Sequence, residues 1–237
     1  MRTPASQRII VPLDVSTPAE ALAIVGRLKG RVGMFKVGLQ LFTAAGPAVV
    51  SRIVAAGERV FLDLKLHDIP NTVAHAATEA ARLGVAMFDL HLSGGARMLG
   101  AAREAVDALN LAPERRPRLL GITVLTSLNQ DDLAAVGVTT RLEEQVVALA
   151  RLGKEAGLDG VVASSREVAA IRRACGEAFV IVTPGIRPEG YAPSDQKRVT
   201  SPREAVAAGA DYLVIGRPIL EAPDPVAAVD AIARELA

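Results

Sequence analysis

Residues 61–72 read Phe-Leu-Asp-Leu-Lys-Leu-His-Asp-Ile-Pro-Asn-Thr, an apolar strand pattern that ends in charged side chains. Asp63 and Lys65 alternate with apolar residues, and Asp68 follows where the strand pattern stops. Charges among groups that exclude water are costly unless they pair with one another. Two carboxylates and an ammonium this close in the chain can pair, and they can shift each other's pKa values. The stretch therefore predicts a functional site at the end of a buried strand.

Further apolar runs with the length of a buried strand recur along the chain. Together with the first, they cover residues 8–14, 34–38, 59–65, 85–93, 119–126, 160–164, 179–185 and 212–217. The segments between them are Ala-rich with helical spacing. Three of these segments open with a hydroxyl and a Glu three residues later, at Thr17, Ser164 and Ser201, which predicts capped helices.

Eight alternating strand and helix units in 237 residues predict the α/β class and a (β/α)8 TIM barrel, with residues 1–237 as one domain. A doubly wound open sheet is the main alternative. No Gly-x-Gly-x-x-Gly follows the first run, which weakens the dinucleotide-binding version of that fold. The longest irregular stretches are 127–139 and 186–200, and in a barrel both would lie on the face where sites are built.

Composition narrows the possible partners and compartments. Half the residues are hydrophobic but 3% are aromatic, so the core should consist of Ala, Val, Leu and Ile, as in parallel sheets covered by helices. A net charge of +1 gives no case for nucleic acid or an anionic membrane. Cys175 is the only cysteine, which excludes an intrachain disulfide and suits a reducing compartment. There is no signal-like stretch before Asp14 and no membrane-length apolar run, so we expect a soluble, cytoplasmic protein.

Polar residues at the carboxyl ends of barrel strands should converge on one site. The residues at these ends are Asp14, Lys36, Asp63, Lys65, His91, Ser93, Thr126, Ser127, Arg187 and Arg217. Lys36 is a charge inside an apolar strand, and Asp63 on the next strand is its natural partner. Lys36, Asp63, Lys65 and Asp68 would then alternate in sign. Such an alternating series of charges keeps Lys65 protonated where burial alone would remove its proton.

Two neighbouring predicted strands end alike, in Gly185-Ile186-Arg187-Pro188 and Gly216-Arg217-Pro218. Glycine lets a backbone approach a ligand closely, and arginine binds phosphate in a bidentate manner. The loops after strands seven and eight are the usual phosphate site of a TIM barrel. The repeated ending therefore favours a phosphate site over a turn with a surface arginine.

Metal and nucleophile sites have weaker support. His67, His75 and His91 are too scattered for a zinc motif. Asp63 and Asp68 could bind Mg²⁺, but Lys65 between them already balances the charge. No Ser-His-Asp arrangement stands out, and Gly-x-Ser-x-Gly is absent. We therefore expect no bound metal.

With these residues in place, the chain resembles the orotidine 5′-phosphate decarboxylase family in its bacterial form. The resemblance covers nearly the whole chain. It rests on Val11-Pro12-Leu13-Asp14, Phe35-Lys36-Val37-Gly38, the stretch 61–72, Ser93-Gly94-Gly95-Ala96-Arg97-Met98, Thr123-Val124-Leu125-Thr126-Ser127, Thr183-Pro184-Gly185-Ile186-Arg187-Pro188, Asp195-Gln196 and Ile215-Gly216-Arg217-Pro218.

The resemblance implies a homodimer that converts orotidine 5′-phosphate to uridine 5′-phosphate and CO₂, the last step of de novo pyrimidine synthesis, without metal or organic cofactor. It implies that Lys65 protonates the carbanion left at C6, and that Asp63 lies near the substrate carboxylate. Lys36 would hold both residues and contact the ribose. Asp68 would reach into the partner's site, with Ile69 and Thr72. Asp14 would bind the ribose, and Thr126 and Ser127 would lie along the pyrimidine. The phosphate end would be held by Arg187, Gln196, Gly216 and Arg217.

Two other functions stay open at the level of sequence. A Mg²⁺-dependent sugar-phosphate lyase such as hexulose-phosphate synthase resembles this family around Asp-x-Lys-x-x-Asp, although the paired Gly-Arg-Pro endings argue against it. A non-catalytic nucleotide-phosphate-binding barrel would not require the full set of Lys36, Asp63, Lys65 and Asp68.

Overall fold

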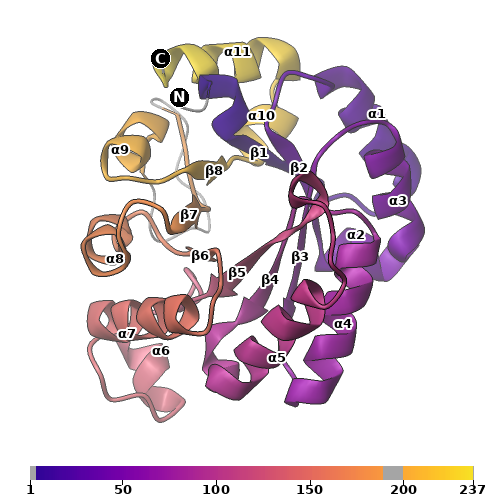
Figure 1. Ribbon diagram of the computed structural model, residues 1–237. Coiled ribbons are helices and arrows are strands. Elements are labelled where there is room, and N and C mark those ends of the chain that lie inside the picture. The colour runs from indigo at the N-terminus through magenta and orange to yellow at the C-terminus, as the bar shows by residue number, and fades with distance from the viewer. Residues whose placement is uncertain (1–3, 189–199, 237) are drawn as a thin grey trace.

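The chain folds into a closed parallel β-barrel surrounded by helices (Figure 1). The computed structural model describes residues 4–188 and 200–236. Each strand pairs with the next one in the sequence, and β8 pairs with β1. The strands are β1 (Ile9–Pro12), β2 (Met34–Gly38), β3 (Val60–Leu66), β4 (Met87–His91), β5 (Arg118–Ile122), β6 (Gly160–Val162), β7 (Val180–Thr183) and β8 (Tyr212–Val214). The predicted (β/α)8 barrel is confirmed, because an open sheet would leave β1 and β8 unpaired.

Helices connect the strands and form the outer layer of the barrel (Figure 1). The α-helices are α1 (Pro18–Leu28), α2 (Leu39–Ala45), α3 (Pro47–Ala55), α4 (Pro70–Arg82), α5 (Gly95–Asp107), α6 (Gln130–Ala135), α7 (Leu142–Glu155), α8 (Val168–Cys175), α9 (Pro202–Ala207), α10 (Arg217–Leu220) and α11 (Pro225–Glu235). Short 3₁₀ helices are η1 (Ala5–Arg8), η2 (Leu92–Gly94) and η3 (Pro113–Arg115). Within residues 4–188 and 200–236, no helix has the length and apolar character that crossing a bilayer requires.

Two layers of apolar side chains form the core. The inner layer fills the barrel with one or two residues from most strands, namely Ile10, Met34, Phe61, Met87, Leu120, Val182, Tyr212 and Val214. The outer layer lies between strands and helices and is mostly Val, Leu, Ile and Ala, as predicted. Phe35, Phe88 and Phe179 are the largest side chains of that layer. A side-chain-filled barrel supports a site at its end rather than a channel through its middle.

Helix starts agree with the sequence at two of three predicted caps. Thr17 and Ser201 form the expected capping boxes with Glu20 and Glu204. The predicted cap at Ser164 is wrong, because α8 begins only at Val168. Ser164 instead begins a turn, in which its carbonyl accepts the Glu167 N–H at 3.1 Å. The hydroxyl-to-Glu spacing alone cannot distinguish a turn from a helix start.

The loops after the strands carry more structure than predicted. The stretch 127–139 contains α6, which Asn129 caps by accepting the N–H groups of Asp131 and Asp132. Several predicted runs also extend past the paired strand, since β1 ends at Pro12, β5 at Ile122 and β8 at Val214. The first extra residue still bonds to the neighbouring strand, as the Leu13 N–H does to the Lys36 carbonyl at 2.8 Å. The residues after it lie beyond the paired strands, where a site can form.

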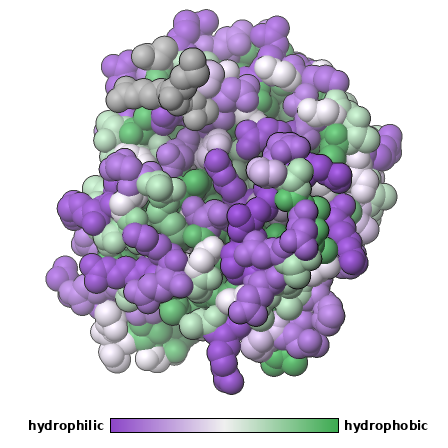
Figure 2. All heavy atoms as spheres, in the orientation of Figure 1, coloured by the Kyte–Doolittle hydropathy of each residue, from purple (hydrophilic) through white to green (hydrophobic). Residues whose placement is uncertain are grey.

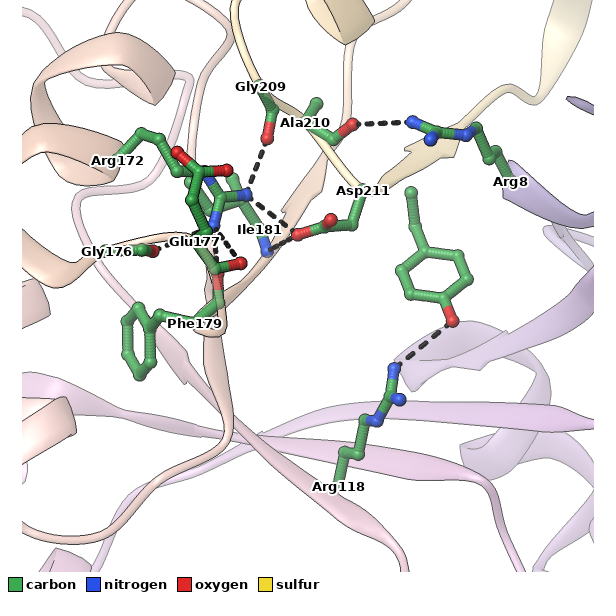
Figure 3. A network of polar contacts seen from close by, with 11 residues as sticks. Arg8, Arg118, Arg172, Gly176, Glu177, Phe179, Ile181, Gly209, Ala210 and Asp211 are labelled. Carbon is green, nitrogen blue, oxygen red and sulfur yellow. Dashed lines mark hydrogen bonds and ion pairs between the residues drawn. The ribbon is translucent and has the colours of Figure 1, made fainter. Parts of the chain in front are cut away.

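The amino-terminal end of the barrel is held by polar contacts (Figure 3). Arg172 on α8 donates to the Gly209 carbonyl at 2.6 Å and to Asp211 Oδ2 at 2.9 Å. The same Asp211 oxygen accepts the Ile181 N–H of β7 at 2.8 Å. These contacts tie α8, β7 and the start of β8 together, which is a stabilising role typical of this end of a TIM barrel.

Candidate active site

A cavity of about 280 Å³ opens at the carboxyl ends of the strands. Its walls combine charged and apolar residues from every strand except β4 and β7, and the loop after β7 also contributes. The lining residues are Pro12, Asp14, Lys36, Phe61, Asp63, Lys65, Ile122, Val124, Leu125, Thr126, Val162, Ala163, Pro184, Gly185, Arg187, Val214, Gly216 and Arg217. The predicted convergence of polar strand ends is therefore present for most of these residues.

Asp63 lies between two lysines at the floor of this cavity. Lys36 Nζ is 3.0 Å from Asp63 Oδ2 and 3.5 Å from Asp14 Oδ1. Lys65 Nζ contacts the other oxygen of Asp63, Oδ1. Asp63 is 9% exposed, so each of its oxygens is shielded from water and paired with an ammonium. The three side chains form a compact charge cluster with one more positive than negative group.

The pKa of Asp63 reflects this pairing. Burial alone would raise it, but Lys36, the adjacent Asp89 carboxyl group and Lys65 lower it from 3.8 to about 2. For Lys36, burial would lower the pKa, while Asp63 and Asp14 raise it above its ordinary value. Both groups are thus ionised at neutral pH. The cluster holds fixed charge in a largely dry pocket, where charge acts more strongly than in water.

Glycine makes room for the Lys36 ammonium. A Cβ atom at Gly38 would lie 2.9 Å from Lys36 Nζ and 3.9 Å from Asp14 Oδ1. Any larger residue would press against the ammonium between the two carboxylates. The Gly38 of the Phe35-Lys36-Val37-Gly38 segment therefore protects the geometry of the charge cluster.

The other side of the cavity is cationic and lies on the loops after β7 and β8. Arg187 is buried and donates Nη1 to the Ile186 carbonyl at 2.8 Å. Arg217 begins α10, directly after Gly216. A Cβ atom at Gly216 would lie 2.9 Å from Pro12 Cγ, so only glycine lets this loop approach β1 so closely. Two arginines on one rim form a suitable site for an anionic group.

Some of the predicted residues do not line the cavity. Asp68, Ile69, Thr72 and Ser127 are exposed on the chain. The Asp68 Oδ1 atom accepts the Ile69 N–H at 2.6 Å. Gln196 lies outside the described residues. His91 ends β4 and Ser93 follows it, but neither lines the cavity, and the His91 ring lies 5.3 Å from that of His67.

Asp89 is a residue of this site that the sequence reasoning missed. It lies in β4, is 1% exposed, and accepts the Lys65 N–H at 2.8 Å through Oδ1. The sequence signal for Asp89 is a charge inside the apolar strand Met87-Phe88-Asp89-Leu90-His91. The same kind of signal identifies Lys36.

The charge cluster offers little to a metal ion. Within the part of the chain that the structure describes, no three His, Cys, Asp or Glu side chains converge as a metal site would require. Both oxygens of Asp63 are engaged by lysines. A cation at Asp63 would have to displace an ammonium.

A closed (β/α)8 barrel with charged residues and an arginine rim at the carboxyl ends of its strands has the architecture of a TIM-barrel enzyme. Residues 7–232 match the model of the "Orotidine 5'-phosphate decarboxylase / HUMPS family". The chain belongs to this family of enzymes.

Curated relatives and solved structures support the assignment over the full length. The chain is 55% identical to an orotidine 5′-phosphate decarboxylase of Syntrophotalea carbinolica, with 100% of this chain and 98% of that protein covered. It is 56% identical to one of Moorella thermoacetica, with 100% and 94% covered. A crystal structure of orotidine 5′-phosphate decarboxylase from Lactobacillus acidophilus matches with a TM-score of 0.86 and 37% identity, covering 96% of this chain and 98% of that one.

Proposed function

We propose that this chain decarboxylates orotidine 5′-phosphate to uridine 5′-phosphate and CO₂ in the last step of de novo pyrimidine synthesis, in the cytoplasm. The observation that carries the proposal is Asp63 held between Lys36 and Lys65 at the floor of a cavity with an arginine rim. Full-length relatives at 52–56% identity with the same printed name support it.

Lys65 is the proposed acid. Loss of CO₂ leaves negative charge on ring carbon C6, and no cofactor is needed if a fixed ammonium lies beside that carbon. The attraction grows as the charge develops, so it stabilises the transition state more than the substrate. Lys65 then donates its proton to C6. Asp63, ionised beside the substrate carboxylate, disfavours the bound substrate relative to the transition state.

The other predicted residues are proposed to bind the remaining parts of the substrate. Arg187, Gln196, Gly216 and Arg217 hold the phosphate, Asp14 and Lys36 hold the ribose, and Thr126 and Ser127 lie along the pyrimidine. The cationic rim supports the phosphate position, since it lies across the cavity from the charge cluster. Binding energy from the remote phosphate can then offset strain at the reacting carbon.

We further propose a homodimer in which Asp68, Ile69 and Thr72 complete the site of the partner subunit. These residues lie after β3 and at the start of α4, are exposed, and do not line the cavity of their own chain. Ile69 is 66% exposed. Figure 2 shows one face of the molecule, on which many residues are hydrophilic. An exposed apolar residue beside a catalytic strand suits an interface between two copies of one surface.

Release of CO₂ from orotidine 5′-phosphate in EDTA is the test. Turnover that survives the chelator supports the proposal. No CO₂ release, together with Mg²⁺-dependent turnover of a hexulose phosphate that EDTA abolishes, would favour a metal-dependent sugar-phosphate lyase. Tight binding of uridine 5′-phosphate without any CO₂ release would favour a non-catalytic nucleotide-binding barrel, and either result overturns the proposal.

A further inference from the structure

The pairing of β3 with β4 is irregular beside the charge cluster. Leu62 pairs with Phe88 and Leu66 pairs with Leu90, so residues 63–65 of β3 lie opposite the single residue Asp89 of β4. A β-bulge of this kind bends the strand and re-aims its side chains. This bulge contains Asp63 and Lys65, two of the three charges of the cluster.

Lys65 has a backbone conformation that lysine rarely adopts. Its φ is +53°, in the left-handed region, and such a conformation costs free energy unless the surroundings hold it. The bulge takes the Lys65 N–H out of the regular ladder. The side chain of Asp89 replaces the missing ladder acceptor, because its Oδ1 accepts this N–H at 2.8 Å.

The second oxygen of Asp89 has no donor. Asp89 Oδ2 is buried and meets no hydrogen-bond donor among the described residues. Asp89 interacts with the carboxyl group of Asp63, which can only accept hydrogen bonds when it is ionised. A buried oxygen without a donor is costly for a carboxylate. A proton on Asp89 removes this cost, because the acid can then donate to Asp63.

We propose that Asp89 is a positioning residue for this site: as a neutral carboxylic acid it holds the Lys65 main chain in the bulge and donates a hydrogen bond to Asp63. Lys65 is the acid in the proposed function, so this inference rests on that function. A neutral Asp89 also preserves the charge of the cluster. Lys36 and Lys65 then face one carboxylate within it, and a net positive charge remains for the developing carbanion.

The charges around Asp89 agree with a neutral acid. Burial and the adjacent Asp63 raise the pKa of Asp89 well above its ordinary range, while Lys65 lowers it by less. Lys36 on β2 also interacts with it. On β5, its neighbour in the pairing is Leu120, which has no charge.

Two variants of Asp89 separate a neutral acid from an ionised carboxylate. Asp89→Asn can accept the Lys65 N–H and donate to Asp63, but it cannot ionise. Asp89→Leu has a similar size and can do neither. We expect Asp89→Asn to keep kcat within about threefold, with an unchanged pH profile, and Asp89→Leu to lose about a hundredfold in kcat with KM changed by less than about threefold.

Amide hydrogen exchange of Lys65 gives a readout that does not depend on the substrate. Asp89→Leu should speed up exchange at the Lys65 N–H, and Asp89→Asn should leave it close to the wild-type rate. If wild-type enzyme releases no CO₂, the proposed function fails while the exchange result still tests the positioning role.

Asp211→Asn is the matched control, since Asp211 also accepts a strand N–H at 2.8 Å, at the opposite end of the barrel. It should lower stability without changing kcat or the exchange of Lys65. The proposal is overturned if Asp89→Leu keeps wild-type kcat, or if its Lys65 amide exchanges at the wild-type rate. A shifted pH profile in Asp89→Asn overturns it as well, and that test remains if Asp89→Leu does not fold.

Discussion

Lys36 Nζ lies 3.0 Å from Asp63 Oδ2, although the two residues belong to different strands. Their strands pair with Gly38 opposite Asp63, so the Lys36 side chain reaches along the barrel interior toward the strand end. It meets Asp63 in the space that Gly38 leaves open. One carboxylate, that of Asp63, therefore pairs with two lysines.

Lys65→Ala should remove most turnover and leave binding of uridine 5′-phosphate measurable. The variant loses the ammonium that donates the proton, while the arginine rim is unchanged. Steady-state CO₂ release and titration with the product measure the two effects. Lys29→Ala, at an exposed lysine that donates to the Ala56 carbonyl, is the control and should be unaffected. Turnover above about a tenth of wild type, a loss under about 1.4 kcal/mol, would show that Lys65 is not the acid.

Arg217→Ala should weaken binding of the phosphorylated product far more than that of the bare nucleoside. A charge-assisted hydrogen bond to phosphate contributes about 1.5–3 kcal/mol, which the nucleoside cannot use. Calorimetric titration of uridine 5′-phosphate and uridine provides the comparison. Arg116, paired with Asp107 before β5, offers a control in Arg116→Ala. Equal losses for both ligands would place the phosphate elsewhere.

Asp63→Asn should change how stability depends on acid pH. The pKa of Asp63 is about 2 in the folded chain against 3.8 ordinarily, so its contribution is present above about pH 3.8 and is lost as the pH falls through 2. That contribution is about 2 kcal/mol. Urea unfolding at about pH 4.5 and about pH 2.5 should therefore show a smaller decrease for the variant than for wild type. An equal decrease in both proteins would contradict the depressed pKa.

Asp89→Asn should become more stable relative to wild type as the pH rises. The folded-state pKa of Asp89 is raised, so its contribution is complete below its unfolded pKa and is lost as the pH rises toward the folded pKa. The asparagine variant has no such loss. Urea unfolding between about pH 4.5 and pH 8 should show a difference that grows by up to about 1.4 kcal/mol per pH unit. Parallel curves for the two proteins would mean that Asp89 is ionised in the folded chain.

Mixing Asp68→Ala with Lys65→Ala should restore activity if Asp68 serves the partner's site. Each variant alone carries a defect in every site. In a mixed dimer, one site has both defects and the other has none. With half the dimers mixed, activity should rise to about a quarter of wild type. No recovery despite demonstrated subunit exchange would place Asp68 in the site of its own chain.

The sequence by itself determined the barrel and most of the charge cluster. Eight apolar runs separated by Ala-rich helical segments admit few arrangements other than a (β/α)8 barrel. Lys36, Asp63 and Lys65 could be identified because a charge inside an apolar strand is costly without a partner. Alternation along a strand and convergence of strand ends are local and fold-level rules, and both can be read from spacing.

Only the tertiary structure decided how those charges meet. The sequence does not reveal that residues 63–65 lie opposite one residue of β4, because register depends on packing between strands rather than on either strand alone. From this register follow the left-handed conformation of Lys65 and its bond to Asp89. Closure of the sheet between β1 and β8 likewise brings Pro12 against Gly216, a contact between residues far apart in sequence. Such contacts form only when the whole barrel closes, so no local pattern in the chain can encode them.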